Sequence, residues 1–414
     1  MKSITIIILS LFIFLNISIA QDISEWREEG RTGVSSETGL MQSWPETGPV
    51  LIWSNLELPK GYSSPSFGNG IIYITGTRGS QDILIALDMG GKILWEKVMG
   101  RAWTGSTPES RATPTVEGSR VYTCSGLGDI TCFDGTTGDI IWSYMASEMN
   151  RGTYGLWGIA ESLLIDGEKI YFSPGGPETM TIALNKATGK LIWKSPSLND
   201  KPGYVSPILI DYAGKRMLVN VSLGHIYAVD ASNGTILWKV AHENPRPGRD
   251  LIFCVTPLFH NGLVYVTAGY NIGGRLIKIA GNGTSASVVW NDDVLDVHHG
   301  GVVQVDGFIY GANWLHNGDG NWCCIDWETG KKMWEKHWNC KGSIISAEGM
   351  LYIYDEKRGN VGLLKATPEK FDLVSSFQIT PGDAGPFWAH PVIRDGVLYI
   401  RHTNALMAFN IKAK

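Results

Sequence analysis

A repeat of about 47 residues constrains the fold of this chain more than any other feature of its sequence. An alternating or apolar segment lies on each side of a glycine that usually follows Asp, Asn or Glu. A glycine between two such segments predicts a tight hairpin, and a fixed period of this length predicts a repeat architecture. The glycines recur at intervals of 42 to 49 residues and mark eight units, at Gly70, Gly118, Gly167, Gly214, Gly262, Gly307, Gly349 and Gly396.

Each unit continues with a third apolar segment, which in most units ends in a recurring phrase such as Cys132-Phe133-Asp134 or Ala183-Leu184-Asn185. In four of the five units that carry the phrase, Gly follows the acidic or amide residue by four positions and Trp follows it by eight, as in Gly189 and Trp193. The phrase predicts a tight turn and then a fourth strand whose tryptophan packs against the next unit. These predicted blade-locking residues are Trp53, Trp95, Trp142, Trp193, Trp238, Trp290 and Trp334.

Four short strands per unit are typical of a β-propeller blade. The eighth unit ends near Phe409 without a fourth strand, and a matching strand precedes the first hairpin at residues 49–53. We therefore predict an all-β fold, an eight-bladed β-propeller of four-stranded antiparallel blades. The ring closes where the N-terminal strand at Trp53 pairs with the C-terminal blade, which leaves no open edge. The single propeller domain is predicted over residues 45–414, after an extended lead-in over residues 21–44.

The first 20 residues predict a secretory signal peptide. Lys2 precedes an apolar run over residues 4–17, and small residues follow before Gln21. The run is shorter than the 20 or so residues of a membrane anchor, which is the alternative. The chain is thus expected to be exported, to the periplasm or outside the cell, without a membrane span after cleavage. A formal net charge of −5 argues against a nucleic-acid partner, and we expect a monomer.

The six cysteines include no Cys-x-x-Cys motif, so neither a zinc site nor a dithiol redox centre is indicated. Cys124 and Cys132 are symmetric about Gly128 in a predicted hairpin. They would therefore lie opposite each other, either as a disulfide or as two separately packed thiols. Cys323 and Cys324 are adjacent on a predicted third strand.

The phrase Ala-x-Asp-x-x-Thr-Gly-x-x-x-Trp, matched at residues 183–193, 132–142 and 324–334, resembles the repeat of pyrroloquinoline quinone (PQQ) enzyme-type propellers. The resemblance covers almost the whole mature chain. The superfamily includes calcium- and PQQ-dependent alcohol dehydrogenases, and also cofactor-free propellers such as the outer-membrane assembly lipoprotein. In the dehydrogenases a Glu, an Asn and the cofactor hold calcium near an Asp base, and a vicinal disulfide often stacks on the quinone. The comparable carboxylates here are Glu161 with Asp250 or Asp296.

Propellers present functional residues at the ends of the central channel, where the chain leads into each innermost strand. The residues just before these strands mix aromatic, charged and imidazole side chains. They are Tyr62, Ser64, Arg111, Thr113, Trp157, Glu161, Tyr204, Ser206, Arg249, Asp250, Cys254, Asp296, His298, His299, Lys341, Ser343, Trp388 and His390. Each also has a structural alternative: Arg111 could form an ion pair with Glu161 or Asp250, and the tryptophans could plug the channel.

Three functions follow from this set. The first is a secreted or periplasmic binding or scaffold propeller, which holds a protein or a glycan at the channel mouth and needs no cofactor. The second is a PQQ- and calcium-dependent alcohol or sugar dehydrogenase. Its catalytic candidates are Asp250, Asp296, Arg111 and Lys341, and its cofactor-binding candidates are Trp157, Glu161 and Trp388. The third is a metal-dependent carbohydrate-active enzyme, whose metal candidates are Glu161, His298 and His390.

Overall fold

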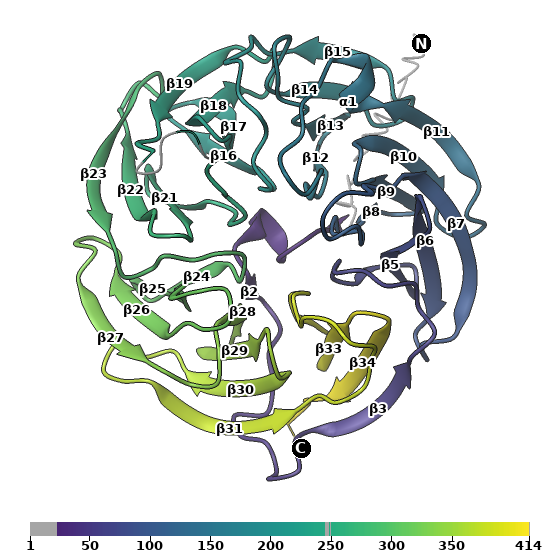
Figure 1. The fold of residues 1–414 in the computed structure, drawn as a ribbon, viewed down its shortest axis with the longest axis vertical. Helices are drawn as coiled ribbons and strands as arrows, with labels where there is room; N and C mark the ends of the chain where they lie inside the picture. Colours follow the sequence, from purple (N-terminus) through teal and green to yellow (C-terminus); the bar gives the residue numbers. More distant parts are fainter. Residues whose placement is uncertain (1–22, 245–247, 249, 414) are drawn as a thin grey trace, which may run out of the picture.

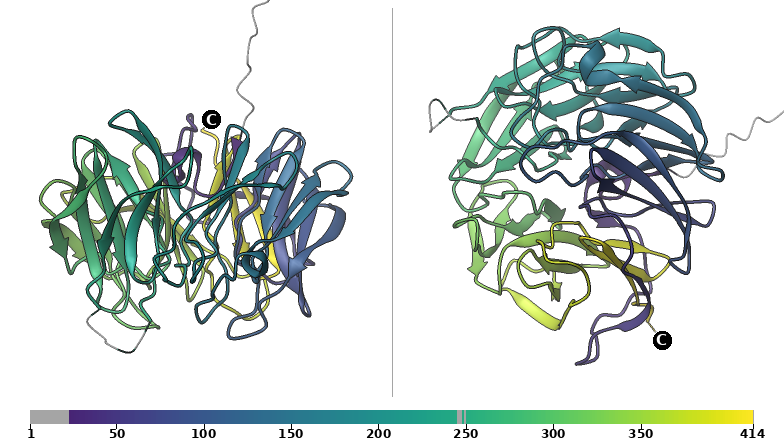
Figure 2. Two further views of the ribbon diagram at one scale, coloured as in Figure 1. Left: turned by 90° about the horizontal axis from the view of Figure 1, so that it is seen from above. Right: turned by 45° about the vertical axis from the view of Figure 1, so that its right-hand side comes forward.

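The computed structural model describes residues 23–244, 248 and 250–413, and they form the predicted ring of eight antiparallel blades (Figure 1). The predicted signal peptide and Arg249 lie outside the described residues. Seen from the side, the ring is a disc whose strands run between its two faces (Figure 2). In each blade the first strand lies at the channel and the fourth at the rim.

Blades 1 to 4 follow one another along the chain. Blade 1 contains β4 (Ser66–Gly68), β5 (Ile71–Arg78), β6 (Gln81–Asp88) and β7 (Ile93–Arg101). Blade 2 contains β8 (Thr115–Glu117), β9 (Arg120–Cys124), β10 (Asp129–Asp134) and β11 (Ile140–Met145), after which the short helix α1 covers Ala146–Met149. Blade 3 contains β12 (Leu164–Asp166), β13 (Lys169–Phe172), β14 (Ile182–Asn185) and β15 (Leu191–Lys194). Blade 4 contains β16 (Ile208–Tyr212), β17 (Lys215–Val221), β18 (His225–Asp230) and β19 (Ile236–Ala241).

Blades 5 to 8 complete the ring. Blade 5 contains β20 (Leu258–His260), β21 (Leu263–Ala268), β22 (Gly273–Ile279) and β23 (Ala286–Asp292). Blade 6 contains β24 (Val302–Val305), β25 (Phe308–Ala312), β26 (Trp322–Asp326) and β27 (Lys332–Lys336). Blade 7 contains β28 (Gly342–Ala347), β29 (Met350–Asp355), β30 (Asn360–Lys365) and β31 (Asp372–Gln378). Blade 8 contains β32 (Val392–Arg394), β33 (Val397–His402), β34 (Ala405–Asn410) and, from the other end of the chain, β3 (Val50–Asn55).

The predicted closure of the ring is confirmed. Strand β3 pairs antiparallel with β34, and Trp53 lies opposite Ala408. The eight hairpin glycines all have positive φ angles, between 55° and 82°. At Asn69-Gly70 both turn residues have positive φ, 51° and 72°, as a type I′ hairpin turn requires. The glycine that marks each unit in the sequence therefore lies at a hairpin turn where the backbone needs a positive φ.

The tryptophans of the fourth strands contact the next blade. The indole of Trp142 lies over the turn at Gly189, and its Nε1 donates to the carbonyl of Lys186 at 2.9 Å. Equivalent bonds run from other fourth-strand tryptophans to a carbonyl in the following blade: Trp53 to Met89, Trp95 to Thr136, Trp290 to Glu328 and Trp334 to Thr367. In blade 7 Phe377 takes this place and lies against Gly48, just before β3.

Buried apolar side chains fill the wedges between neighbouring blades. One cluster, for example, joins Tyr122 and Cys132 of blade 2 to Ile170 and Leu184 of blade 3. The hydrophobic core therefore consists of separate clusters between neighbouring blades. The central channel is not part of these clusters.

The predicted placement of Cys124 opposite Cys132 is wrong, and of the two alternatives the structure has separately packed thiols. The turn between β9 and β10 is centred on Leu127, one residue before Gly128, so Cys124 pairs with Ile130 and Cys132 with Tyr122. All six cysteines are free thiols. A shift of one residue in the turn is enough to separate the two sulfur atoms, because it changes which residues lie opposite each other.

The lead-in crosses the channel, which the sequence did not predict. Its strand β1 (Ile23–Ser24) pairs with the inner strand β8 of blade 2, and β2 (Val34–Ser35) pairs in parallel with the inner strand β28 of blade 7. Between them the 3₁₀ turn η1 (Glu29–Arg31) lies in the middle of the ring, coloured purple in Figure 1. We call residues 23–35 the channel segment.

Two buried arginines fix the channel segment to four blades. Arg31 donates to the carbonyls of Leu163 and Pro207, just before the inner strands of blades 3 and 4, at 2.7 and 2.9 Å. Arg27 donates to the carbonyls of Val302 and Ile344, in the inner strands of blades 6 and 7. These bonds satisfy both the buried cations and the carbonyls, and burial without such partners would be costly.

Candidate functional site

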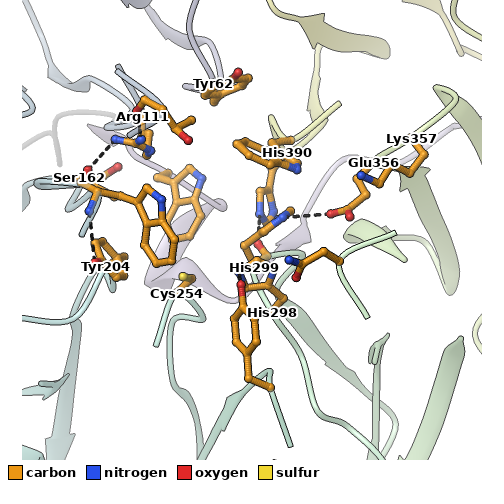
Figure 3. A pocket seen from close by; sticks show the side chains of 17 residues that line it. Tyr62, Arg111, Ser162, Tyr204, Cys254, His298, His299, Glu356, Lys357 and His390 are labelled. Carbon is orange, nitrogen blue, oxygen red and sulfur yellow. Dashed lines mark hydrogen bonds and ion pairs between the residues drawn. The ribbon is translucent and has the colours of Figure 1, made fainter. Parts of the chain in front are cut away.

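A cavity of about 370 Å³ lies at one mouth of the central channel (Figure 3). The chain leading into the inner strands supplies most of its wall, and the channel segment contributes Trp26. Its aromatic lining comprises Trp26, Tyr62, Trp157, Tyr204, Tyr270 and Trp388. Its charged, imidazole and other polar lining comprises Arg111, His298, His299, Glu356, Lys357, His390, Thr107, Ser162, Asn317 and Cys254, with the small Ala160 between them.

The structure therefore brings part of the predicted set together. Arg111, Trp157, Trp388, His298 and His390 line the cavity, whereas four other candidates do not: Glu161, Asp250, Asp296 and Lys341.

Glu161 is directed away from the cavity. Its neighbours Ala160 and Ser162 line the wall, and in an extended chain adjacent side chains point to opposite sides. The buried Glu161 carboxyl accepts the Ser173 N–H at 3.2 Å through Oε2. Burial raises the pKa of Glu161 to about 8, although Arg31 and the bonds from Ser173 lower it. A carboxyl that stays protonated at neutral pH is a poor calcium ligand.

The two aspartates serve other parts of the fold. Asp250 is exposed and pairs with Lys201 at 2.7 Å. Asp296 is buried, and its carboxylate accepts the N–H groups of Asn271, Ile272 and Gly273 at 2.9 Å each. These bonds hold a turn in which Tyr270 has a φ of 64°. Such a backbone conformation costs energy in a residue with a side chain, so Asp296 positions Tyr270 in the cavity wall.

Lys341 lies behind the cavity wall in a buried ion pair. Its Nζ lies 2.6 Å from Oε1 of Glu356, and both side chains are 3% exposed. The same ammonium donates to the carbonyls of His316 and Asn317 at 3.1 and 3.2 Å. All three of its N–H donors are thereby used. Lys341 therefore fixes the loop that carries Asn317, rather than presenting a free amine to the cavity.

Glu356 is the single carboxylate among the described lining residues. It lies between Lys341 and His299, whose Nε2 is 2.9 Å from Oε2. Burial alone would raise the pKa of Glu356, but the charges and bonds of His299 and Lys341 outweigh burial and lower it to about 2. This carboxylate is ionised at any physiological pH and its charge is already balanced.

Burial disfavours the charged form of His390 and His298. His390 uses both ring nitrogens, because Nδ1 accepts from Arg27 at 2.9 Å and Nε2 donates to the carbonyl of His299 at 3.2 Å. Burial, with the nearby Arg27 charge, lowers the pKa of His390 well below its usual value. Burial likewise lowers the pKa of His298 to about 2, and its Nε2 lies 3.2 Å from the Tyr270 hydroxyl.

Arg111 brings a positive charge to the opposite wall. Figure 3 shows it on the far side of the cavity from Glu356. Its Nη1 donates to the carbonyl of Trp157 at 2.8 Å and its Nη2 to the carbonyl of Thr107. The ion pairs predicted for it with Glu161 or Asp250 are not formed, because Glu161 faces Ser173 and Asp250 pairs with Lys201. Burial lowers the pKa of Arg111, yet a guanidinium stays charged in proteins.

The aromatic rings of the lining pack on one another. Trp388 contacts Tyr62 and His299, with ring centroids 5.0 and 5.2 Å apart. Trp157 contacts Tyr204 edge to face at 5.4 Å. Trp26 of the channel segment packs edge to face on His390 at 5.3 Å. These contacts fix the orientation of the rings, so the cavity is preformed.

Sequence reasoning missed Trp26, Tyr270 and Glu356. Tyr270 and Glu356 lie in the turns between second and third strands, which reach the same face as the chain leading into the inner strands. The repeat could have predicted these positions, because it places a turn between the second and third strands of every blade. Trp26 could not have been found in this way, because the channel segment lies outside the repeat.

The residues present do not fit the calcium and PQQ of the dehydrogenases that the repeat resembles. The single lining carboxylate is already paired, and the predicted Glu161 ligand faces elsewhere. Cys323 and Cys324 are buried free thiols in β26 that pack toward opposite neighbouring blades. Nor do the described residues contain a group of three His, Cys, Asp or Glu side chains that could hold a metal ion.

Comparison with known proteins identifies the family. A family model described as "Outer membrane protein assembly factor BamB" matches residues 79–336, more than half of the chain. The chain belongs to this family of PQQ-like propellers. Within the described residues, none of the helices is long and apolar enough to cross a membrane.

Curated relatives of this PQQ-like propeller have two kinds of name. The polyvinylalcohol dehydrogenase of Sphingopyxis sp. is 26% identical over 270 residues, which cover 58% of this chain and 38% of the relative. The assembly factor BamB of Escherichia coli is 24% identical over 189 residues, 44% of this chain and 43% of the relative. The quinoprotein alcohol dehydrogenase PedH of Pseudomonas putida is 24% identical over 314 residues, which cover 73% of this chain and 42% of the relative. The matched parts thus span less than half of each of these relatives.

Solved structures show the same fold. BamB from Moraxella catarrhalis superposes with a TM-score of 0.61 at 16% identity, over 88% of this chain and 98% of that chain. The quinohemoprotein alcohol dehydrogenase ADHIIG from Pseudomonas putida superposes with a TM-score of 0.62 at 12% identity, over 93% and 79%. The two neighbours differ in named function but fit equally well, so function has to be inferred from the site.

Proposed function

We propose that this protein is an exported binding propeller that holds a glycan in the cavity at the channel mouth and carries out no redox chemistry. The observation that supports this function is the aromatic lining. Trp157, just before the inner strand of blade 3, and Trp388, just before the inner strand of blade 8, both line a preformed cavity that also contains polar groups. A sugar ring offers C–H faces that pack on indoles and hydroxyls that need hydrogen-bond partners, and the cavity supplies both.

The lining favours binding over the two enzymatic alternatives. Hydrolysis of a glycoside ordinarily uses two carboxyl groups that flank the scissile bond. The described lining supplies only Glu356, and Lys341 and His299 hold its charge. A calcium quinoprotein would need carboxylate and amide oxygens free to bind the ion, and Glu356 is again the single lining carboxylate.

The test is isothermal titration calorimetry of the protein against a panel of neutral and acidic oligosaccharides. Trp157→Ala and Trp388→Ala are each expected to weaken binding at least tenfold. The control is Ile52→Ala, which removes an exposed side chain from the outer strand β3, outside the cavity lining, and should leave the affinity unchanged. Unchanged affinity in both cavity variants would contradict the proposal. So would micromolar binding of PQQ with calcium that yields quinone absorbance and dye-linked alcohol oxidation.

A protein partner is the second candidate. Four of the relatives are named as assembly factors, and the outer strands expose pairs of aliphatic residues, such as Ile140 with Ile141 and Leu191 with Ile192. Rows of exposed apolar residues at a rim are typical of protein interaction surfaces. This candidate predicts that the double substitution of Ile141→Lys and Ile192→Lys abolishes co-purification of a defined partner while sugar binding is retained.

A further inference from the structure

We propose that the glycan is acidic: the cavity takes a hexuronate, a sugar that carries a carboxylate, and Arg111 is the side chain that binds the carboxylate. This inference rests on the proposed function and names the ligand class of the same site. It is carried by the distribution of charge in the lining and by the unused donors of Arg111.

Arg111 is held in place but retains donors. A guanidinium has five N–H donors, and the two bonds to the carbonyls of Thr107 and Trp157 use two of them, which leaves three. A carboxylate binds bidentately through two parallel N–H donors. Because backbone carbonyls rather than a carboxylate anchor the side chain, the positive charge of Arg111 is not balanced by a bonded counterion.

The one negative charge in the described lining is balanced before any ligand binds. Glu356 lies between Lys341 at 2.6 Å and His299 at 2.9 Å. Arg111 and the exposed Lys357 are therefore the charges that a ligand meets, and both are positive. The carboxylates that act on Arg111 through space, Glu109 and Asp82, lie outside the cavity lining. A ligand carboxylate would supply a directly bonded anion, whereas a neutral sugar would not.

The positive charge continues beyond the cavity. A second hollow shares Lys357 with the cavity wall and is also lined by Arg358 and His337. The acidic residue there, Asp319, accepts from His337 at 3.0 Å. An oligosaccharide that leaves the cavity on this side would pass two exposed cations, so a chain with a carboxylate on each ring fits better than one with a single charged end.

Arg111 and the stacking surface are adjacent. The bond from Nη1 to the Trp157 carbonyl fixes the guanidinium at the backbone of Trp157, and both residues line the same cavity. A pyranose ring packed on Trp157 would therefore bring an equatorial carboxylate within reach of the free N–H donors. A flat quinone with carboxylates is the competing anionic ligand, and it is included in the test.

The test compares uronate trisaccharides with the neutral trisaccharides of the same linkage by calorimetry at low and at physiological salt. The protein is expected to bind at least one uronate tenfold or more tightly than its neutral counterpart, a difference of about 1.4 kcal/mol. Added salt should reduce this preference, because screening weakens charge pairs that are partly open to water. Arg111→Gln should abolish the preference, and Arg111→Lys should retain part of it. The control Lys239→Gln removes an exposed cation from the outer strand β19 and should change nothing.

The outcomes separate the two proposals. Equal affinity for uronate and neutral sugars, or a preference that survives Arg111→Gln in a variant with the wild-type circular dichroism spectrum, overturns the acidic ligand and leaves glycan binding in place. Absence of binding to any sugar overturns both. Both proposals are also overturned if PQQ alone binds at the same concentrations and Arg111→Gln abolishes this binding. That result would show that Arg111 binds the carboxylates of a quinone and not those of a sugar.

Discussion

The contact between the fourth-strand tryptophan and the turn of the next blade can be tested with a pair of glycines. An ideal Cβ at Gly189 would lie 2.5 Å from Cε3 of Trp142, far inside the usual carbon contact distance of about 3.5–4.0 Å. At Gly214 nothing lies within 4 Å of the added atom. The two glycines have nearly the same backbone conformation, with φ of 68° and 70°. The backbone cost of alanine, about 1–2 kcal/mol, therefore cancels between them.

Gly214→Ala is expected to lower the free energy of unfolding by this backbone cost alone. Gly189→Ala adds the cost of overpacking, about 1–3 kcal/mol, so it should lose about 2–5 kcal/mol in total. The assay is urea unfolding followed by tryptophan fluorescence, with the slope of the transition checked for each variant. In a Trp142→Leu background, the extra cost at Gly189 should disappear. Equal losses in the two single variants would refute the packing of Trp142 on this turn.

Three further predictions concern buried charges. Arg31→Met should lower the free energy of unfolding by about 3–5 kcal/mol in urea titrations, because it leaves two buried carbonyls and Glu25 without their cation; a loss below 1 kcal/mol would contradict this. Lys341→Met should lower the free energy of unfolding by about the same amount, and the double variant with Glu356→Gln should be less destabilised than Lys341→Met alone. If the losses of the two single variants simply add in the double variant, the pair is not coupled. Burial raises the pKa of Glu161 from 4.5 to about 8, so the stability from its neutral carboxyl is present below about pH 4.5 and lost as the pH rises to about 8. Glu161→Gln should therefore gain stability relative to the wild type over this range, by up to about 5 kcal/mol, and a constant difference between pH 5 and 8 would argue against it.

The blades could be predicted because their signals are local. A hairpin glycine, a turn phrase and a tryptophan within one unit of about 47 residues report backbone constraints that act within that unit or its neighbour. The ring closure was readable for the same reason, since a strand was missing at one end and present at the other. The predicted pairing of Cys124 with Cys132 was wrong because it depended on the position of one turn to within a single residue. The repeat pattern does not resolve turn position that finely.

The site was only partly predictable. Glu161 was predicted at the channel mouth because it comes just before an inner strand. Its neighbours Ala160 and Ser162 do line the cavity, but alternation along an extended chain turns Glu161 toward Ser173. The channel segment gave no repeat signal at all. Its Arg27 binds the carbonyl of Ile344, 317 residues away in sequence, and such a contact is specified by the three-dimensional shape of the channel. Trp26 of the same channel segment is thereby held in the cavity lining.

The central claim, that the channel-mouth cavity holds a glycan, is tested most directly by a crystal structure of the protein soaked with the tightest-binding oligosaccharide from the calorimetric panel. The predicted result is density for a sugar ring packed on Trp157 or Trp388 inside the cavity. For a uronate, the carboxylate should lie within hydrogen-bond distance of Arg111. Density for the sugar on the outer rim of the blades, with the cavity filled only by solvent, would contradict the account.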